Sequence, residues 1–510
     1  MTGRAFRYVG VARTTPFALG YLLGSGQSLE LGGLQAPVLT TQPFSNRMPF
    51  DPSGVYDFAD PSALTLIPLV SPQKTPLSTG ATPYPQNILG EGTEVGSTNA
   101  LTSIALANGF SSFPLVASSV GQGAAPFSVI KRGGSGNCYA AGIYEAQGVL
   151  AWVHANISPT AKVQCLGLPF HHGEADSQNN MTPSAYSALE VEYQADFESD
   201  LGTLFGQGGR IPLVVSQQTT QAGSFNGPPS SALAQYSDAK ARPRSIILAC
   251  AKYMFPYAGD NLHLSNYLPL DDKMGEVLWE VYQTGTFTPL WPTHIARVGN
   301  VYTLTMNVPH GPLVFDETAA APHGPGTPWS MWADGFGFGV GDRPFRITGS
   351  TGTGVTPIVL QCDDLSLYPL GDLPADDAVA VQIVGGNTNA NGVWKGAQAT
   401  ILAGNQIQLN GATGNGDYIE APIPPSGFSP LPIVNATIVE PNQVVLTTGR
   451  TQLSAAEVSY ALYSDRPWGA STGGFGAGRC GVLRDSNPAI GFNTGQPLYN
   501  WCVLFAETVP

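Results

Sequence analysis

Charged residues are scarce in this sequence, and basic residues are the scarcest. Charged side chains make up 11% of the 510 residues, roughly half the share found in an ordinary soluble domain. The chain has 22 Lys and Arg residues against 36 Asp and Glu residues, which gives a formal net charge of −14. So few positive charges argue against a basic surface that would bind nucleic acid or an anionic membrane. The aromatic content of 10% also argues against intrinsic disorder.

Long apolar runs and paired cysteines are absent as well. The run Phe17 to Leu23 is too short to span a bilayer, and no later run is long enough. The start of the chain lacks the apolar stretch of a signal peptide, so we expect synthesis in the cytoplasm and no membrane insertion. The cysteines are scattered without C-x-x-C spacing, which indicates neither a disulfide framework nor a zinc site. Cys165 and Cys250 lie inside apolar runs and are predicted to be buried free thiols.

Glycine and proline are abundant, and their setting differs between the two halves of the chain. The 61 Gly and 43 Pro residues indicate a turn-rich protein with much β-structure. In the first half, short apolar runs alternate with helical patterns, as expected for buried parallel strands in an α/β domain. These runs cover residues 17–23, 113–119, 163–168, 211–216 and 245–250. We predict a flavodoxin-like α/β domain with a five-stranded parallel sheet over residues 15–290, preceded by an N-terminal arm over 1–14.

Two of the helical patterns have clear ends. Thr182 followed by Pro183 is typical of a helix start, with Thr as the N-cap and Pro in the first turn. A second helix is predicted over Asp271 to Thr284, with Gly285 as its stop. Residues 72–100, rich in Pro, Thr, Gly, Ser and Asn, are predicted to form a long surface connection.

The second half of the chain has a β pattern. Val301 to Val308 and Gln406 to Leu409 alternate with a period of two, and turn residues recur about every ten positions. We predict an all-β region of the sandwich type over residues 291–510. The stretch 345–420 fits a small β module inserted into it.

Polar clusters follow four of the predicted strands. They are 24–28, 120–123, 170–176 and 260–263. Because ligands bind at the carboxyl ends of parallel strands, these clusters should meet at one edge of the sheet. Their residue types suit acyl transfer: Ser28 as nucleophile, His263 as its base and Asp260 as the group that orients the base. The backbone N–H groups of Ser28 and Gly121 are candidate donors to the oxyanion.

The motifs resemble a known family. Gly26-Gln27-Ser28, Gly121-Gln122-Gly123, the Gly173-Glu174-Ala175-Asp176 block and Asp260-x-x-His263 are together similar to the SGNH hydrolases, in their sialate O-acetylesterase-like branch. The resemblance covers residues 15–290 and implies a serine esterase with Ser28, Asp260 and His263 as the triad and with no cofactor.

One position departs from the family pattern. The family has Gln before Gly-Glu, where it serves as a side-chain oxyanion donor, and this chain has His172. A protonated or suitably tautomeric His172 is the candidate replacement, and Gln27 and Glu174 are further candidate oxyanion or substrate-binding residues. The alternative for the block around His172 is a structural role, as a hydrogen-bonded turn that braces the site. A metal site is the least favoured reading because no His-x-x-x-His spacing is present.

A second resemblance concerns the β half. The stretches 383–418, 481–488 and 498–502 look like β modules of bacteriophage tail and receptor-binding proteins. This resemblance implies a virion location, other virion proteins as partners and a homotrimer by analogy. The sequence thus predicts a carbohydrate O-deacetylase that acts on acylated bacterial surface polysaccharide as part of a phage-like particle. The alternative is a non-catalytic glycan-binding or structural virion protein on the same fold. A third reading, an exported cellular polysaccharide esterase, needs a secretion route.

Overall fold

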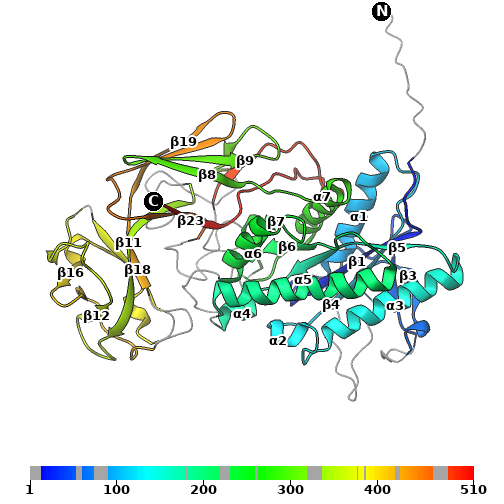
Figure 1. Ribbon diagram of the computed structural model, residues 1–510, viewed down its shortest axis with the longest axis horizontal. Coiled ribbons are helices and arrows are strands. Elements are labelled where there is room, and N and C mark those ends of the chain that lie inside the picture. Colours follow the sequence, from blue (N-terminus) through cyan, green and yellow to red (C-terminus); the bar gives the residue numbers. More distant parts are fainter. Residues whose placement is uncertain are drawn as a thin grey trace, which may run out of the picture.

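The computed structural model places an α/β half beside a β half (Figure 1). It describes residues 13–52, 60–73, 90–179, 181–218, 230–258, 262–318, 336–375, 377–383, 386–419, 426–462 and 481–510. Asp260, Cys480 and nearly all of the predicted N-terminal arm therefore lie outside the described residues. No helix in the described part of the chain is both long enough and apolar enough to cross a membrane.

The α/β half is built on a seven-stranded sheet in the order β3-β2-β4-β1-β5-β6-β7. The five predicted parallel strands are all present, as β1 (Leu19–Gly26), β4 (Leu115–Gly121), β5 (Val163–His171), β6 (Leu213–Gln217) and β7 (Ile246–Ala251). The predicted count of five is wrong because β2 (Arg47–Phe50) and β3 (Thr65–Pro68) extend one edge. β3 runs antiparallel to β2, so the sheet is not wholly parallel.

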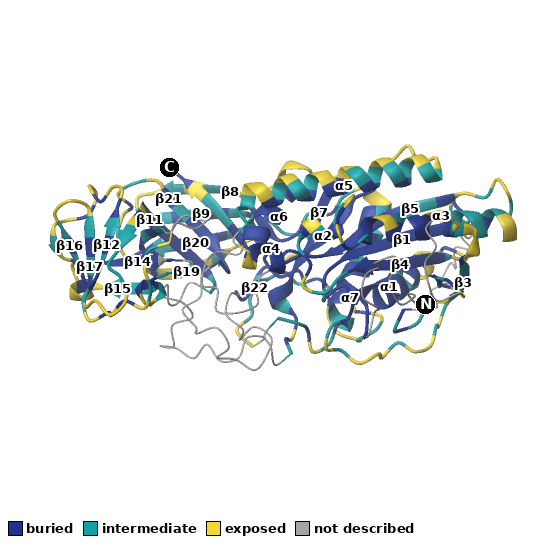
Figure 2. Ribbon diagram, turned by 90° about the horizontal axis from the view of Figure 1, so that it is seen from below, coloured by how far each residue is buried: buried dark blue, intermediate teal, exposed yellow. Residues whose placement is uncertain are grey.

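Helices cover both faces of this sheet (Figure 2). α1 (Thr93–Ala107) and α7 (Leu268–Thr284) share one apolar core with the sheet. The opposite face packs against α3 (Cys138–Asn156), α5 (Pro183–Phe205) and α6 (Ser230–Ala241). Short helical segments are α2 (Phe127–Ile130), α4 (Glu174–Gln178), η1 (Pro61–Ala63) and η2 (Lys252–Met254).

The predicted helix start at Thr182–Pro183 and the predicted helix stop at Gly285 are confirmed. The predicted start at Asp271 is wrong, because α7 begins at Leu268, and the predicted surface connection is also wrong. The Thr182 hydroxyl accepts from the Ala185 amide at 3.2 Å, and α7 ends at Gly285 with a φ of 82°, a conformation that suits glycine. Residues 72–100 do not form one long surface connection, because α1 begins at Thr93 and its first ten residues are buried.

The β half contains a four-stranded antiparallel sheet and a larger, ten-stranded one. The first has the order β19-β20-β9-β8, with β8 (Trp291–Val298), β9 (Val301–Asn307), β19 (Ile433–Val439) and β20 (Gln443–Thr448). The second contains β11 (Phe338–Ser350), β12 (Ile358–Cys362), β13 (Gly371–Asp372), β14 (Ala378–Gln382), β15 (Gly392–Lys395), β16 (Ala399–Leu402), β17 (Gln406–Leu409), β18 (Ser426–Pro430), β21 (Ala456–Tyr460) and β23 (Phe505–Val509). β10 (Val314–Phe315) pairs with β22 (Leu483–Arg484), and η3 (Thr388–Ala390) and η4 (Gly396–Gln398) are single turns.

The simple sandwich that the sequence predicts is wrong in its details. β11 is 13 residues long and pairs with β21, β18 and β12 along its length. It therefore continues from the part that packs on the four-stranded sheet into a second part with its own core. That separate core is formed by residues between Phe345 and Ala412, inside the range predicted for an inserted module. The module boundaries themselves stay a prediction.

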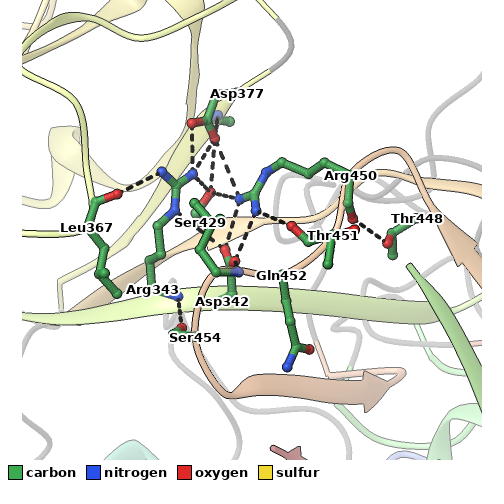
Figure 3. A network of polar contacts seen from close by, with 12 residues as sticks. Asp342, Arg343, Leu367, Asp377, Ser429, Thr448, Arg450, Thr451, Gln452 and Ser454 are labelled. Atoms are coloured by element: carbon green, nitrogen blue, oxygen red, sulfur yellow. Dashed lines mark hydrogen bonds and ion pairs between the residues drawn. The ribbon is translucent and has the colours of Figure 1, made fainter. Parts of the chain in front are cut away.

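A buried network of charges lies where β11 enters this second part (Figure 3). The Arg343 guanidinium donates to both carboxylate oxygens of Asp377, at 2.6 and 2.8 Å. Arg450 donates to both carboxylate oxygens of Asp342 at 2.9 Å, and the Ser429 hydroxyl accepts from both arginines. Two cations thus share two carboxylates and one hydroxyl, which joins β11, β18 and the segment before β14.

The two halves of the chain share one apolar core. Residues of α6 and β7 pack in the same cluster as residues of β8, β9 and β23. The Gln217 side chain donates to the Leu504 carbonyl and accepts from the Leu504 amide, both at 2.8 Å. The hydroxyl of Tyr253 donates to the Cys502 carbonyl. The β half therefore completes the packing of the α/β half at the β7 edge.

The prediction that Cys165 and Cys250 are buried free thiols is confirmed. Burial raises the pKa of each thiol to about 12, so neither carries a reactive thiolate near neutral pH.

Candidate active site

Ser28 follows the central strand of the sheet. β1 lies between β4 and β5 and ends at Gly26. A Cβ at Gly26 would overlap the carbonyl of His171 on β5, so glycine is required there. In the turn that follows, the Gly33 amide donates to the Ser28 carbonyl at 2.8 Å. Ser28, which is partly exposed, is thus presented at the carboxyl edge, where α/β sheets bind ligands.

His263 lies beside this turn, in the loop between β7 and α7. Its carbonyl accepts from the Ala258 amide at 2.7 Å, which closes the loop. A Cβ built on Gly33 would lie 2.8 Å from Cδ2 of His263, 3.0 Å from its Nε2 and 3.0 Å from the Ser28 carbonyl oxygen. The segment of the predicted nucleophile and the ring of the predicted base therefore both lie against Gly33.

Two further predicted members of the site have different outcomes. Asp260 lies outside the described residues, so its role in orienting His263 stays a prediction. Gly121 is the last residue of β4 and pairs with Gly26. A Cβ on Gly121 would lie 2.6 Å from the Gly26 carbonyl oxygen. Gly121 therefore lies at the same edge as Ser28, and its role as an oxyanion donor stays a prediction.

Gln27 and Glu174 lie beneath the site rather than on its surface. Both are buried. The Gln27 side-chain oxygen accepts from the Ala175 amide at 3.4 Å, and the Glu174 carboxylate forms an ion pair with Lys252 at 2.5 Å. These contacts give both residues a bracing role, and direct substrate contact by either one stays a prediction.

His172 is fully buried and is engaged within the chain. Its Nε2 lies 2.9 Å from the Ala125 carbonyl oxygen and its Nδ1 lies 3.2 Å from the Tyr186 hydroxyl. The ring packs 4.5 Å, centroid to centroid, from that of Phe127. Burial lowers the pKa of His172 to about 3, so the ring is neutral near pH 7. These contacts do not support an oxyanion role for His172, because Nε2–H is the donor to Ala125. They match the alternative of a hydrogen-bonded turn that braces the site.

Asp176 braces the same turn. Its carboxylate accepts from the Phe127 amide at 3.1 Å and lies 3.5 Å from Nε2 of His172. Burial raises the pKa of Asp176 to about 6. Because His172 is neutral, this close approach is not an ion pair near pH 7.

A pair of buried carboxyl groups behind Ser28 escapes sequence reasoning. Glu30 accepts from the Ser119 hydroxyl at 2.6 Å and lies against Glu94 at the start of α1. Burial raises the pKa of Glu30 to about 7, and burial together with the charge of Glu30 raises the pKa of Glu94. The pair therefore holds a proton near neutral pH. Gly24 on β1 leaves room for both carboxyl groups, because a Cβ at this position would overlap the side chains of Glu94 and Glu30.

Lys252 is the other functional candidate that the sequence analysis misses. It directly follows β7 and is fully buried. The available signal was a lysine two positions after the apolar run 245–250, since a buried lysine almost always has a charged partner.

In the described part of the chain, no three His, Cys, Asp or Glu side chains are grouped to hold a metal ion. A cavity of about 250 Å³ is lined by Arg210, Arg244 and Tyr282 among others. It lies where β5 and β6 begin, at the opposite edge of the sheet from the candidate site.

No family model matches the chain, and no curated protein matches it. Among solved structures, the chain is similar to a carbohydrate acetylesterase from Xanthomonas citri, with a TM-score of 0.43 and 10% identity over 96% of this chain and 80% of that one. It is also similar to a protein from Arabidopsis thaliana, with a TM-score of 0.34 and 12% identity over 52% of this chain and 97% of that one. For NanS the TM-score is 0.30 and the identity 14%, over 46% of this chain and 78% of that one.

Proposed function

We propose that the chain is a serine esterase that removes acyl groups from carbohydrate. One observation carries this proposal: the turn of Ser28 and the ring of His263 meet at Gly33, at the carboxyl edge of the sheet. Ser, His and glycine amides at such an edge are the parts that acyl transfer requires.

The reaction follows from the roles of these groups. The Ser28 hydroxyl attacks the ester carbonyl while His263 takes its proton, and the amides of Ser28 and Gly121 stabilise the oxyanion. His263 then protonates the departing sugar hydroxyl, which leaves an acyl group on Ser28. A water molecule that gives a proton to His263 attacks this acyl-enzyme, the free acid is released, and His263 returns the proton to the Ser28 oxygen. Asp260 orients the His263 ring in this scheme.

The finer assignment rests on the sequence. The motifs around Ser28 resemble the sialate O-acetylesterase-like branch of the SGNH hydrolases, which favours acetyl as the acyl group. Only 22 Lys and Arg residues are present, so a neutral sugar suits the chain better than an acidic one held by ion pairs. We propose acylated bacterial surface polysaccharide as the substrate and a phage-like particle as the setting, with a homotrimer as its assembly.

One observation favours a second candidate function. Both ring nitrogens of His172 bond within the chain, which supports a site without the side-chain oxyanion donor that the resembling family has at this position. A protein that binds glycan on this fold without hydrolysing it has no need of that donor.

The test compares wild type with Ser28→Ala and His263→Ala. We expect wild type to release acetate from O-acetylated glycans and its Ser28 to react with a fluorophosphonate probe, and both variants to lose these activities. Ser237→Ala and His294→Ala alter exposed residues and are the matched controls. Glycan binding by wild type without labelling of Ser28 or acetate release would establish the second candidate instead.

A further inference from the structure

A buried lysine links two segments of the candidate site. The Nζ atom of Lys252 donates to Oε1 of Glu174 at 2.5 Å and to the carbonyl oxygen of Leu262 at 3.3 Å. Both charged side chains are almost completely shielded from solvent. Because Leu262 immediately precedes His263, one buried cation holds both α4 and the loop that carries the candidate base.

The other end of this linkage leads to the nucleophile. Ala175, the neighbour of Glu174 in α4, donates its amide to the Gln27 side chain at 3.4 Å. Gln27 immediately precedes Ser28. A path of hydrogen bonds therefore runs beneath the site from the residue before the nucleophile to the residue before the base.

The linkage also spans the sheet. Glu174 begins α4 after β5, Lys252 begins η2 after β7, and β6 lies between these strands. Two strand spacings amount to about 10 Å, a distance that the long lysine side chain helps to cover.

Burial, together with the charge of Lys252, lowers the pKa of His171 to about 3. His171 at the end of β5 is therefore neutral and adds no second cation beneath the site.

We propose that Lys252 and Glu174 are positioning residues for catalysis, and that their ion pair sets the distance between Ser28 and His263. Glu174 fixes the ammonium group, and the ammonium group fixes the Leu262 carbonyl and with it the backbone of His263. This inference rests on the proposed esterase function and assigns the residues that align its nucleophile and base.

Stability alone does not account for this arrangement. A buried ion pair is often no more stabilising than well-packed apolar side chains of similar volume, because both charges must leave water. Apolar side chains can replace the packing of the pair, but they cannot donate to the Leu262 carbonyl. This difference separates a positioning role from a merely structural one.

The experiment uses the full chain and the double variant Lys252→Met/Glu174→Leu, with Lys252→Met and Lys252→Arg beside it. Lys273→Met is the matched control, because Lys273 is also buried and ion-paired, with Glu276, but contacts the segment around Leu498 instead. The measurements are the melting temperature, kcat and KM on p-nitrophenyl acetate, and the rate of fluorophosphonate labelling of Ser28.

We expect the double variant to fold and to lose about 10- to 100-fold in kcat and in labelling rate, with little change in KM, because small misplacements of catalytic groups have effects of this size. Lys252→Arg should recover part of that loss, and Lys273→Met should keep its kcat per folded molecule. Wild-type kcat in a folded double variant or in Lys252→Met would overturn the positioning role while leaving the esterase function intact. A wild type that neither hydrolyses acyl esters nor is labelled would overturn both.

Discussion

A methyl group at position 33 would strike the ring of His263. The Cβ of Gly33→Ala would lie 2.8 Å from Cδ2 of the ring and 3.0 Å from Nε2, whereas carbon atoms in contact prefer about 3.5–4.0 Å. The Ser28 carbonyl oxygen, also 3.0 Å from this Cβ, restricts movement of position 33 itself. The ring must therefore shift by about 1 Å.

The size of the effect follows from this shift. A misplacement of about 1 Å can lower the rate about 100-fold, which corresponds to about 2.7 kcal/mol of activation free energy. Gly33 does not have a positive φ, so alanine adds no backbone strain. We expect the loss to appear in catalysis far more than in the free energy of unfolding.

The assay compares kcat/KM on p-nitrophenyl acetate, fluorophosphonate labelling and urea unfolding for wild type, Gly33→Ala and Gly208→Ala. Gly208 is the matched control, because a Cβ there meets nothing within 4 Å. Gly208→Ala should behave as wild type. If Gly33→Ala kept the wild-type kcat/KM, the His263 ring would not lie against Gly33 in the working enzyme, and the proposed pairing with Ser28 would be refuted.

Three other perturbations test the groups around the site and the β half. Burial raises the pKa of Glu30 from 4.5 to about 7, so the folded state keeps a proton that the unfolded state releases. The Glu30 contribution to the free energy of unfolding should therefore fall by about 2.5 kcal/mol between pH 5 and pH 8. Glu30→Gln should remove this part of the pH dependence in urea titrations. Asp377→Asn removes the carboxylate that the buried Arg343 contacts most closely and leaves it only Asp342, at 3.5 Å. The variant should lower stability by about 3–5 kcal/mol in thermal unfolding, with esterase activity unchanged below the transition. His172→Ala should lower stability by about 3 kcal/mol through a cavity and lost hydrogen bonds, while labelling of Ser28 stays within about threefold of wild type.

Each of these expectations has an opposite outcome. A stability that rises between pH 5 and pH 8 by the same amount in wild type and Glu30→Gln would contradict the buried, protonated carboxyl group. An Asp377→Asn variant as stable as wild type would show that the charge of Arg343 does not depend on the Asp377 carboxylate. A loss of about 100-fold or more in His172→Ala, the size associated with an oxyanion donor, would restore His172 to the catalytic site.

The central strands could be predicted because strands covered on both faces are continuous apolar runs. β2 and β3 could not, since each has only four residues and lies at the edge of the sheet. α1 was missed for a different reason. Its buried side includes Glu94 and Asn99, so the helix has no apolar stripe, and its polar composition resembles that of a loop.

The candidate site could likewise be predicted only in part from the sequence. Ser28 and His263 could be brought together from the sequence because the strand order of a parallel sheet places their loops at one edge. The contacts beneath them could not, because the Lys252–Glu174 pair joins residues 78 positions apart and depends on which side chains lie inside. The packing of His172 was also invisible, since only the structure shows the Ala125 carbonyl that its ring meets.

The shared core between the two halves has a consequence for synthesis of the chain. The Gln217 side chain in β6 can bond the nearby Ala232 carbonyl early, but its two hydrogen bonds to Leu504 form only after 287 further residues have been synthesised. At ordinary elongation rates the ribosome needs about 15 to 60 s for that interval. During this time the β7 edge of the nascent α/β half is uncovered and open to aggregation or to chaperone binding. A fragment of residues 13–290 should be cut faster by protease than the same region in the full chain, and equal rates would show that the α/β half matures without its partner.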